Sequence, residues 1–410
     1  MTIHPRELEE FLSPQPVLDS LNTHLTSRCN LRCLYCPQGK GITDDRTDMP
    51  PDLLEHLIQY VASHKVPAVG FGYFGETTLY AGWENSCQRL LEIGTALSLT
   101  ANFAAPLTTR ALDVLSRFRY IEMSIDSVDG GLLRMLRPPI DVRTILYNLH
   151  AIRARAMASG GASPFICWPC VLTDRSAREL SDLVLFAASC GVDRLQINEM
   201  YRFDGTPDEI RNILELPDAE FLAAFDRLEQ AVALGRQHAL PVSVSGIEKY
   251  RARAEAIRMP TTGTAETPRL RRGRIQGIQG PADHYYLGPG ISPGQTRLCL
   301  YPWSTAYVAA TGDVYACCAR GTVMGNIQRE GGLDSVLVNT RYRELRRQLL
   351  TGEIRDPVCR ICSMAPAAPI VNQVERVRQR LGRESWTQRL GRHLRKRRMS
   401  RATGAGDAAR

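Results

Sequence analysis

Short apolar runs alternate with longer amphipathic segments over the first 245 residues of the chain. The apolar runs predict strands, and segments whose apolar residues recur every three or four positions predict helices. The predicted strands are Leu21–Thr26, Ala68–Phe74, Leu97–Phe103, Tyr120–Asp126, Phe165–Leu172 and Arg194–Asn198. The predicted helices are Pro50–Ser63, Trp83–Gly94, Thr108–Arg117, Val142–Met157 and Ala177–Cys190. This alternation favours β/α units arranged around a parallel sheet.

Six such units are too few for a closed eight-stranded barrel, so the pattern predicts an α/β fold with a partial (β/α)6 parallel barrel. In β/α barrels, functional side chains gather at the carboxyl ends of the strands. Beyond the sixth unit, residues 207–239 predict mostly helix and residues 240–245 a short strand. Residues 246–297 are rich in Gly, Pro, Thr and Arg, and they predict a linker or a lid.

Three cysteines, Cys29, Cys33 and Cys36, follow the first predicted strand with C-x3-C-x2-C spacing. Thiolates ligate iron–sulfur clusters, and three of them leave one iron of a four-iron cluster without a protein ligand. Structural zinc prefers paired C-x2-C or Cys/His sets, and disulfide frameworks suit short secreted chains. The loop therefore favours an iron–sulfur cluster with one open coordination position.

A second cysteine set lies near the carboxyl end of the chain, at Cys299, Cys317, Cys359 and Cys362. A predicted hairpin turn at residues 311–313 brings Cys299 and Cys317 together. Four thiolates can hold a tetrahedral zinc ion or fully ligate a [4Fe–4S] cluster, and the residue types alone leave both open. Cys318 competes with Cys317 for one ligand position, and the Gly-x4-Cys spacing favours Cys317.

The run from Cys29 to Cys36 resembles the cluster loop of the radical S-adenosylmethionine (radical SAM) superfamily. That resemblance implies a [4Fe–4S] cluster that binds SAM and cleaves it reductively to a 5′-deoxyadenosyl radical. The second set resembles the auxiliary-cluster region of SPASM/twitch enzymes. The central C-x2-C-x5-C-x3-C block of full SPASM domains is absent, so the resemblance implies one auxiliary [4Fe–4S] cluster. It covers about residues 20–200 and 299–365.

The resemblance also implies roles for residues around SAM. Tyr35 matches an aromatic residue near the adenine, and Gly75 with Glu76 matches a turn that binds the SAM amino group, although Phe74 replaces the first glycine of that turn. Ser124 and Asp126 match contacts to the ribose and carboxylate, and Asn102 is a further SAM-side candidate. On residue chemistry alone, Gly75 is also an ordinary turn glycine, and Ser124 or Asp126 a helix cap.

Cys167 and Cys170 lie on the fifth predicted strand, at an odd spacing that turns them to opposite faces. One of them is a candidate hydrogen-atom donor, and a buried non-reactive thiol is the alternative for both. Three residues at the end of the sixth strand are candidate substrate contacts: Gln196, Asn198 and Glu199.

The twelve cysteines, with no signal-like start and no apolar run of the ~20 residues that span a bilayer, predict a cytoplasmic protein without a membrane span. Residues 374–410 carry 12 Lys and Arg against 3 Asp and Glu, so their net charge of +9 exceeds the +8 of the whole chain. Such a tail suits nucleic acid, an anionic surface or a solvated terminus. The near-neutral remainder makes nucleic acid an unlikely main substrate.

These observations predict five parts: an extension (1–19), the barrel core (20–245), a linker or lid (246–297), a small α+β auxiliary-cluster domain (298–370) and a basic tail (371–410). By analogy with twitch enzymes, we expect oxidation or epimerisation of a small polar metabolite such as a sugar or cyclitol. A peptide maturase is the alternative, disfavoured because about twenty residues precede the first strand. A non-catalytic zinc or iron–sulfur binding protein is the alternative from another class. We expect a flavodoxin- or ferredoxin-type electron donor.

Overall fold

The computed structural model describes ten stretches of the chain: residues 3–14, 17–38, 47–72, 74–203, 205–259, 270–275, 282–287, 291–318, 321–362 and 364–382. The basic run at residues 395–398 of the predicted tail lies outside these stretches. Of the Arg-rich segment, residues 270–275 are described, and residues 269 and 276–281 are not.

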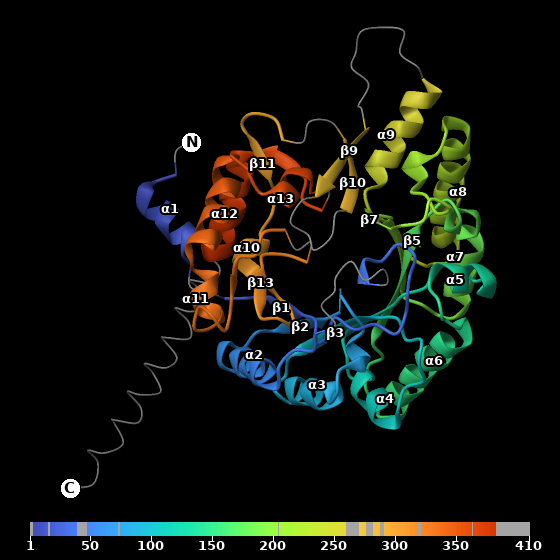
Figure 1. Ribbon diagram of the computed structural model, residues 1–410, viewed down its shortest axis with the longest axis horizontal. Helices are drawn as coiled ribbons and strands as arrows, with labels where there is room; N and C mark the ends of the chain where they lie inside the picture. Colours follow the sequence, from blue (N-terminus) through green and yellow to red (C-terminus); the bar gives the residue numbers. More distant parts are fainter. Residues whose placement is uncertain are drawn as a thin grey trace.

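One large sheet dominates the described part of the chain, in the order β14-β13-β12-β1-β2-β3-β4-β5-β6-β8 (Figure 1). The strands from β12 to β8 are parallel to their neighbours, whereas β13 and β14 are antiparallel. Their bounds are β1 Ser20–Thr23, β2 Ala68–Phe71, β3 Ala96–Ala101, β4 Tyr120–Met123, β5 Phe165–Leu172, β6 Arg194–Glu199, β8 Val242–Val244, β12 Thr305–Val308, β13 Asp313–Tyr315 and β14 Gly325–Asn326.

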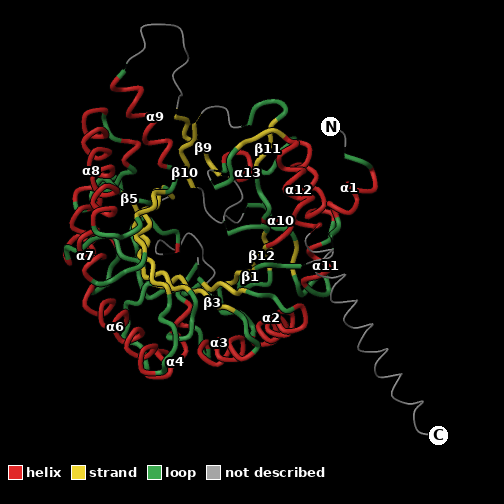
Figure 2. The backbone as a smooth tube through the Cα atoms, turned by 180° about the vertical axis from the view of Figure 1, so that it is seen from behind, coloured by secondary structure: helices red, strands yellow, loops and turns green. Residues whose placement is uncertain are grey.

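Helices cover the outer face of this curved sheet (Figure 2). They are α2 Pro51–His64, α3 Trp83–Glu92, α4 Thr109–Leu115, α5 Gly130–Leu136, α6 Val142–Ala158, α7 Leu180–Ser189 and α8 Asp218–Gln237, with single 3₁₀ turns at Thr77–Leu79, Ser176–Arg178 and Ile213–Glu215. Alternate strand residues such as Leu97, Leu99 and Ala101 are buried, and their neighbours are half-buried. The predicted α/β partial barrel is confirmed, and β8 extends it by one parallel strand.

The carboxyl-terminal region continues the barrel sheet, since β12 pairs in parallel with β1 from Ser20↔Thr305 to Thr23↔Val308. The predicted hairpin joins β12 and β13, with Gly312 at φ +82° in its turn. The remaining elements here are α10 Tyr301–Ser304, α11 Leu333–Leu337, α12 Thr340–Thr351, α13 Pro357–Ile361, and a small sheet of β11 Gln295–Arg297 with β15 Ala367–Pro369.

The two ends of the described chain pack on this region. Helix α1, Pro5–Leu12, lies beside α12 (Figure 1), where the Trp303 indole donates to the Phe11 carbonyl at 2.7 Å and Arg346 donates to the Leu12 carbonyl at 2.9 Å. A helical segment at residues 370–382 buries Gln373 and Val377. The first part of the predicted tail is therefore built into the fold.

The segment predicted as a linker or lid contains regular structure where it is described. Helix α9, Ile247–Arg258, follows β8 directly, and β9 Leu270–Ile275 pairs with β10 Ala282–Leu287, which also pairs with β7 Arg202–Phe203. Its Gly and Pro content concealed these elements because such residues usually mark loops. None of the described helices is long and apolar enough to cross a membrane.

Candidate functional site

The three-cysteine loop leaves the carboxyl end of β1 and is fixed to the segment that ends α5. The Arg32 amide donates to the Pro138 carbonyl at 2.7 Å, and the Leu34 amide to the Leu136 carbonyl at 2.9 Å. Cys29 is exposed, Cys36 is half-buried and Cys33 is buried. Burial raises the pKa of the Cys33 thiol to about 12 and that of Cys29 to about 11, and the charge of Cys36 adds to both shifts.

Gly75 allows the turn after β2 to touch the cysteine loop. Its φ is +71°, and a Cβ built there would lie 2.0 Å from the Thr26 carbonyl oxygen and 2.9 Å from that of Arg28. Any side chain would therefore push the two loops apart. The next amide, that of Glu76, donates to the Arg28 carbonyl at 2.7 Å.

Glu76 is buried where these loops meet β3. Its carboxylate accepts the Asn102 amide hydrogen at 2.7 Å and the Thr78 hydroxyl at 2.8 Å, and burial raises its pKa. The Asn102 side-chain amide donates to Asn30 Oδ1 at 2.7 Å and reaches the Cys29 sulfur at 3.7 Å. Glu76 and Asn102 thus connect the ends of β2 and β3 to the cysteine loop.

Asp126 takes part in a buried ion pair with Arg137. Arg137 Nε lies 2.6 Å from Asp126 Oδ2 and Nη2 lies 3.1 Å from Oδ1, while the Val171 amide donates to Oδ1 at 2.8 Å. The Tyr35 hydroxyl also donates to Asp126, and Arg137 lies over the Tyr35 ring at 5.4 Å. Burial raises the pKa of Tyr35 well above its usual range. Asp126, Arg137 and Tyr35 therefore form a buried polar cluster that is packed against the cysteine loop.

The other predicted residues lie on different sides of the sheet. Ser124 is half-buried just beyond the end of β4. The thiol of Cys170 lies 3.6 Å from the Asp126 carbonyl oxygen and is wholly buried. Cys167 is on the opposite face of β5, and burial raises its pKa to about 11. Among the candidate substrate contacts, Gln196 donates to Asn198 at 3.0 Å, whereas Glu199 is buried in an ion pair with Lys249.

The second cysteine set lines one cavity of about 290 Å³. Its lining residues include Cys299, Cys317, Cys359 and Cys362, together with apolar side chains such as Leu298 and Leu349. Burial raises the pKa of Cys299 to about 11, and it also raises that of Cys359. The cavity contains the four thiols expected from the sequence.

Buried polar side chains hold the backbone around this cavity. Arg297 donates to the Cys359 carbonyl at 3.1 Å and to the Arg360 carbonyl at 2.6 Å. The side-chain oxygen of Gln373 accepts from the Cys299 backbone amide at 3.1 Å, and its side-chain nitrogen donates to the Cys299 carbonyl at 2.6 Å. Asp356 caps α13, accepting from the Cys359 amide at 2.9 Å.

Cys318 lies between the cavity and the barrel. It packs against Tyr307 and Tyr315, and the charges of Cys362 in the cavity lining and of Glu122 on β4 both act on it. The cavity lining contains Cys317 and does not include Cys318. The choice between Cys317 and Cys318 as the ligand stays a prediction.

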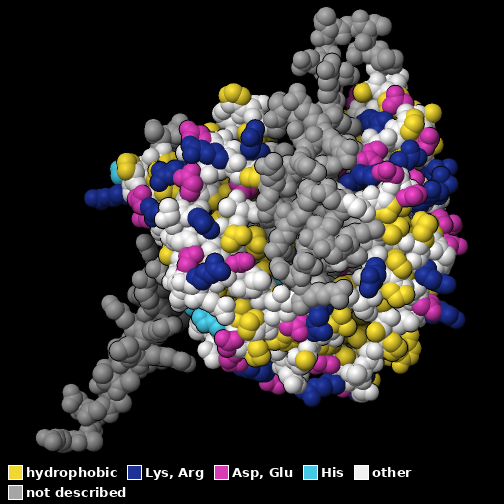
Figure 3. All heavy atoms as spheres, in the orientation of Figure 1, with side chains coloured by type: hydrophobic (Ala, Val, Ile, Leu, Met, Phe, Trp, Pro, Cys, Tyr) yellow, Lys and Arg dark blue, Asp and Glu magenta, His cyan; other side chains and the backbone are white. Residues whose placement is uncertain are grey.

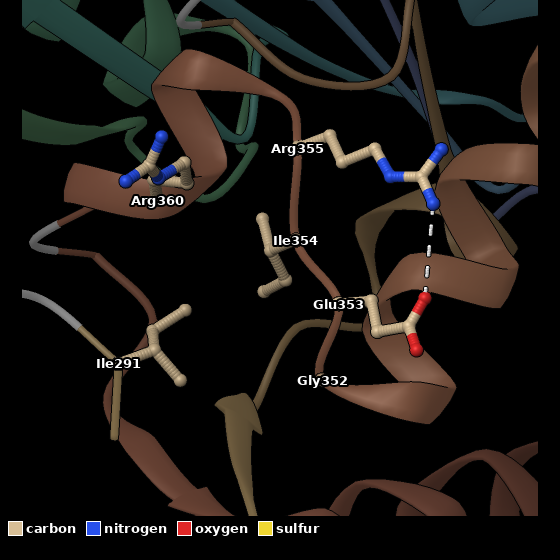
Figure 4. A pocket seen from close by; sticks show the side chains of 6 residues that line it. All are labelled: Ile291, Gly352, Glu353, Ile354, Arg355 and Arg360. Carbon is tan, nitrogen blue, oxygen red and sulfur yellow. Dashed lines mark ion pairs between the residues drawn. The ribbon is translucent and has the colours of Figure 1, made fainter. Parts of the chain in front are cut away.

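A larger hollow of about 440 Å³ borders the segment between α12 and α13 and shares no lining residue with the auxiliary cavity (Figure 4). It is lined by Ile291, Gly352, Glu353, Ile354, Arg355 and Arg360, with Glu353 and Arg355 paired at 3.8 Å. Both charged side chains are about three-quarters exposed. An open hollow that holds neither a thiol nor a buried titratable group offers no site for chemistry.

Both thiol sets fit iron–sulfur clusters by donor type and number. Among the described residues, no three Cys, His, Asp or Glu side chains already stand in the geometry of a single bound metal ion. The fit therefore rests on three thiols in one loop beside the Gly75 cradle, and on four thiols around one cavity. Soft thiolate ligands of this kind select iron–sulfur clusters or zinc.

A partial β/α barrel with a three-cysteine loop at the carboxyl ends of its strands is typical of an iron–sulfur protein. Residues 23–184 match the model of the radical SAM superfamily, and residues 299–363 match that of the SPASM iron–sulfur cluster-binding domain. The chain therefore contains a radical SAM domain followed by a SPASM domain. It accordingly has a SAM-binding [4Fe–4S] cluster and auxiliary iron–sulfur binding.

Known proteins resemble the chain at low identity. A curated relative from Pyrococcus furiosus, the tungsten-containing aldehyde ferredoxin oxidoreductase cofactor-modifying protein, is 24% identical over 202 residues, which are 47% of this chain. The match spans about half, 54%, of that relative. Streptococcus suis SuiB bound to S-adenosylmethionine has a TM-score of 0.55 at 17% identity, covering 85% of this chain and 72% of SuiB. The structure of native anSMEcpe with bound AdoMet has a TM-score of 0.51 at 17% identity, covering 84% of this chain and 88% of anSMEcpe. These structures show the shared fold.

Proposed function

We propose that this chain is a radical SAM enzyme that oxidises a small polar substrate at a carbon–hydrogen bond. The SAM-binding cluster supplies, when bound, a one-electron reduction of SAM that yields a 5′-deoxyadenosyl radical able to take a hydrogen atom. Net oxidation needs an acceptor for a second electron. The cavity lined by Cys299, Cys317, Cys359 and Cys362 carries this proposal, since it provides four thiols for a fully ligated cluster.

The chain's own residues bind and position the reactants in this proposal. Cys29, Cys33 and Cys36 hold the SAM-binding cluster, and the loops at Gly75 and Asn102 fix their position from the neighbouring strands. Ser124 and the backbone around Glu76 are the candidate contacts to SAM. Tyr35 and Asp126 act indirectly, because their polar atoms are joined to each other and to Arg137.

A peptide substrate is the second candidate, and it has a specific basis. SuiB has been seen bound to its precursor peptide SuiA, and anSMEcpe to the Cp18Cys peptide, on the same fold as this chain. A polar barrel interior suits either a metabolite or a peptide side chain.

The test measures iron, acid-labile sulfide and 5′-deoxyadenosine after anaerobic reconstitution. We expect about eight irons in the wild type, and about four each in a Cys29/Cys33/Cys36→Ala variant and in a Cys299/Cys359/Cys362→Ala variant. SAM with a reductant should give 5′-deoxyadenosine in the wild type but not in the first variant. About four irons in the wild type would exclude the proposed electron acceptor, and no 5′-deoxyadenosine would favour a binding protein. Adding metabolite and peptide fractions of a cell extract separately then shows which one stimulates SAM cleavage.

A further inference from the structure

A row of polar side chains crosses the inner face of the barrel. On β5 the Trp168 ring packs 5.8 Å from Phe186 of α7, so Cys167 next to it faces away from the helices. On β4, Ile121 and Met123 are wholly buried, and Glu122 between them points the opposite way. The strand register places Glu122 directly between Thr100 on β3 and Cys167 on β5.

Glu122 is held in place by two neutral donors. The Thr100 hydroxyl donates to Glu122 Oε2 at 2.6 Å, and the Tyr120 hydroxyl donates to Oε1 at 3.0 Å. These bonds fix the side-chain conformation without neutralising its charge. The carboxylate is half-buried, so it is covered by neighbouring strands but open to a ligand on one side.

This carboxylate has no ion-pair partner among the residues that the structure describes, unlike two buried carboxylates at or just beyond the ends of β6 and β4. Asp126 pairs with Arg137, and Glu199 pairs with Lys249. Arg194, which the register places beside Cys167, lies over the Phe165 ring at 5.3 Å. Burying part of a carboxylate without a cation is costly, and a bound cation recovers that energy.

The position of Glu122 also fits a substrate that reaches between the two cysteine sites. Its charge acts on Cys167 on the neighbouring strand and on Cys318, which follows β13 beside the auxiliary cavity. A molecule bound here would lie inside the barrel, between the SAM loops and the auxiliary region.

We propose that Glu122 is a specificity-determining residue that binds a cationic group of the substrate, an ammonium or a guanidinium. Thr100 and Tyr120 are positioning residues that aim its carboxylate. This inference rests on the proposed function, because it takes the barrel interior as the place where the substrate binds. An amino sugar and a lysine or arginine side chain would supply the same chemistry.

The test uses matched charged and neutral probes on the reconstituted full chain with SAM, followed by calorimetry or ligand-observed NMR. Glucosamine is compared with glucose, and N-acetyl-lysine amide with N-acetyl-norleucine amide. At least one amine should bind about tenfold more tightly than its neutral partner, the effect of a 1.4 kcal/mol ion pair. Glu122→Gln should remove that preference, whereas Glu10→Gln, a change at an exposed glutamate of α1, should keep it. The pair that responds distinguishes a sugar from a peptide.

Equal binding of amine and neutral probes, or a preference that survives Glu122→Gln, would overturn the proposal. If Glu122→Gln does not fold, Tyr120→Phe decides, with an expected loss of about fivefold in amine affinity alone, the value of one hydrogen bond. Unchanged amine binding in Tyr120→Phe would then count against the proposal. Formation of 5′-deoxyadenosine by the same wild-type preparation tests the proposed function separately. If it forms without any amine preference, only the role of Glu122 is wrong.

Discussion

The two cysteine sites are assembled in opposite ways. Cys29, Cys33 and Cys36 lie within eight consecutive residues, but the groups that fix their loop come from distant strands and include Gly75, Asn102 and the Asp126–Arg137 pair. The second set spans Cys299 to Cys362, and it converges on a cavity whose supports, such as Arg297 and Gln373, lie close to the cysteines in sequence. The first site has ligands close together in sequence and supports from distant strands. The second has ligands far apart in sequence, and each support lies near one cysteine and hydrogen-bonds to the backbone at another.

This difference has a physical consequence. The first site depends on the packed barrel, since its supports are a buried ion pair and close backbone contacts that form only when β2, β3 and β4 are in place. The second site depends on Arg297 and Gln373, whose side chains hydrogen-bond to backbone groups of the cysteine segments. Damage to the barrel supports should therefore affect the first site and the stability of the fold together, whereas damage to the second should be more confined.

The largest expected effect comes from Arg137→Met. Removing the guanidinium leaves the Asp126 carboxylate buried without its cation, which costs about 3–5 kcal/mol. Urea unfolding should show this loss, and iron bound by the Cys29 loop should fall more than iron in the auxiliary cavity. Arg143→Met is the control, because the Arg143–Asp141 pair is on the surface with Arg143 mostly exposed. A similar loss in both variants would contradict a special role for the buried pair.

Gly75→Ala separates steric contact from backbone strain. Gly75 and Gly82 both have positive φ, at +71° and +79°, but a Cβ at Gly82 meets nothing within 4 Å. We expect Gly82→Ala to cost about 1 kcal/mol from backbone strain alone, and Gly75→Ala about 2–4 kcal/mol because it also clashes with the Thr26 carbonyl. Thermal unfolding and SAM binding are the measurements. Equal effects would show that the contact between the turn and the cysteine loop is dispensable.

Sequence periodicity predicted the strands of the barrel and most of its covering helices but not the short α5, Gly130–Leu136, and β5, Phe165–Leu172, matches its predicted bounds. Local patterns suffice there because strand alternation and helical spacing are short-range signals. The hairpin at Gly312 was equally visible, since its turn residues sit between two apolar runs. Cysteine spacing predicted both candidate ligand sets for the same reason.

Long-range pairing was beyond the sequence. Nothing in the pattern shows that β12 would extend the barrel beside β1, or that Arg137 would pair with Asp126 across the end of α5. Tyr35 and Asp126 were predicted as SAM contacts, but a resemblance cannot reveal that their polar atoms meet each other. Glu122 escaped notice because a single glutamate in a strand is distinguished only by the neighbours that surround it.

Gln373→Leu tests whether the hydrogen bonds from this side chain to the Cys299 backbone support the auxiliary site without affecting the Cys29 loop. The change removes both side-chain hydrogen bonds to the Cys299 backbone and leaves the half-buried Cys299 carbonyl without this donor, while the amide keeps the Arg297 carbonyl at 2.9 Å; the cost is about 1–3 kcal/mol. Auxiliary iron should fall while SAM still binds at the Cys29 loop. Gln379→Leu on the same helical segment is the matched control, since Gln379 is exposed and donates only to Glu375. Loss of SAM binding in Gln373→Leu would show that the two sites are not independent.

The smallest expected effect distinguishes the two adjacent cysteines. Cys317 lines the auxiliary cavity, whereas Cys318 is not in its lining and packs against Tyr307 and Tyr315. We therefore expect Cys317→Ser to lose up to about four irons and Cys318→Ser to lose none after anaerobic reconstitution. Serine keeps the size of the side chain, so each variant tests ligation rather than packing. If Cys318→Ser alone loses iron, the ligand set includes the thiol nearer Glu122, and the auxiliary cluster lies closer to the barrel interior than the cavity lining indicates.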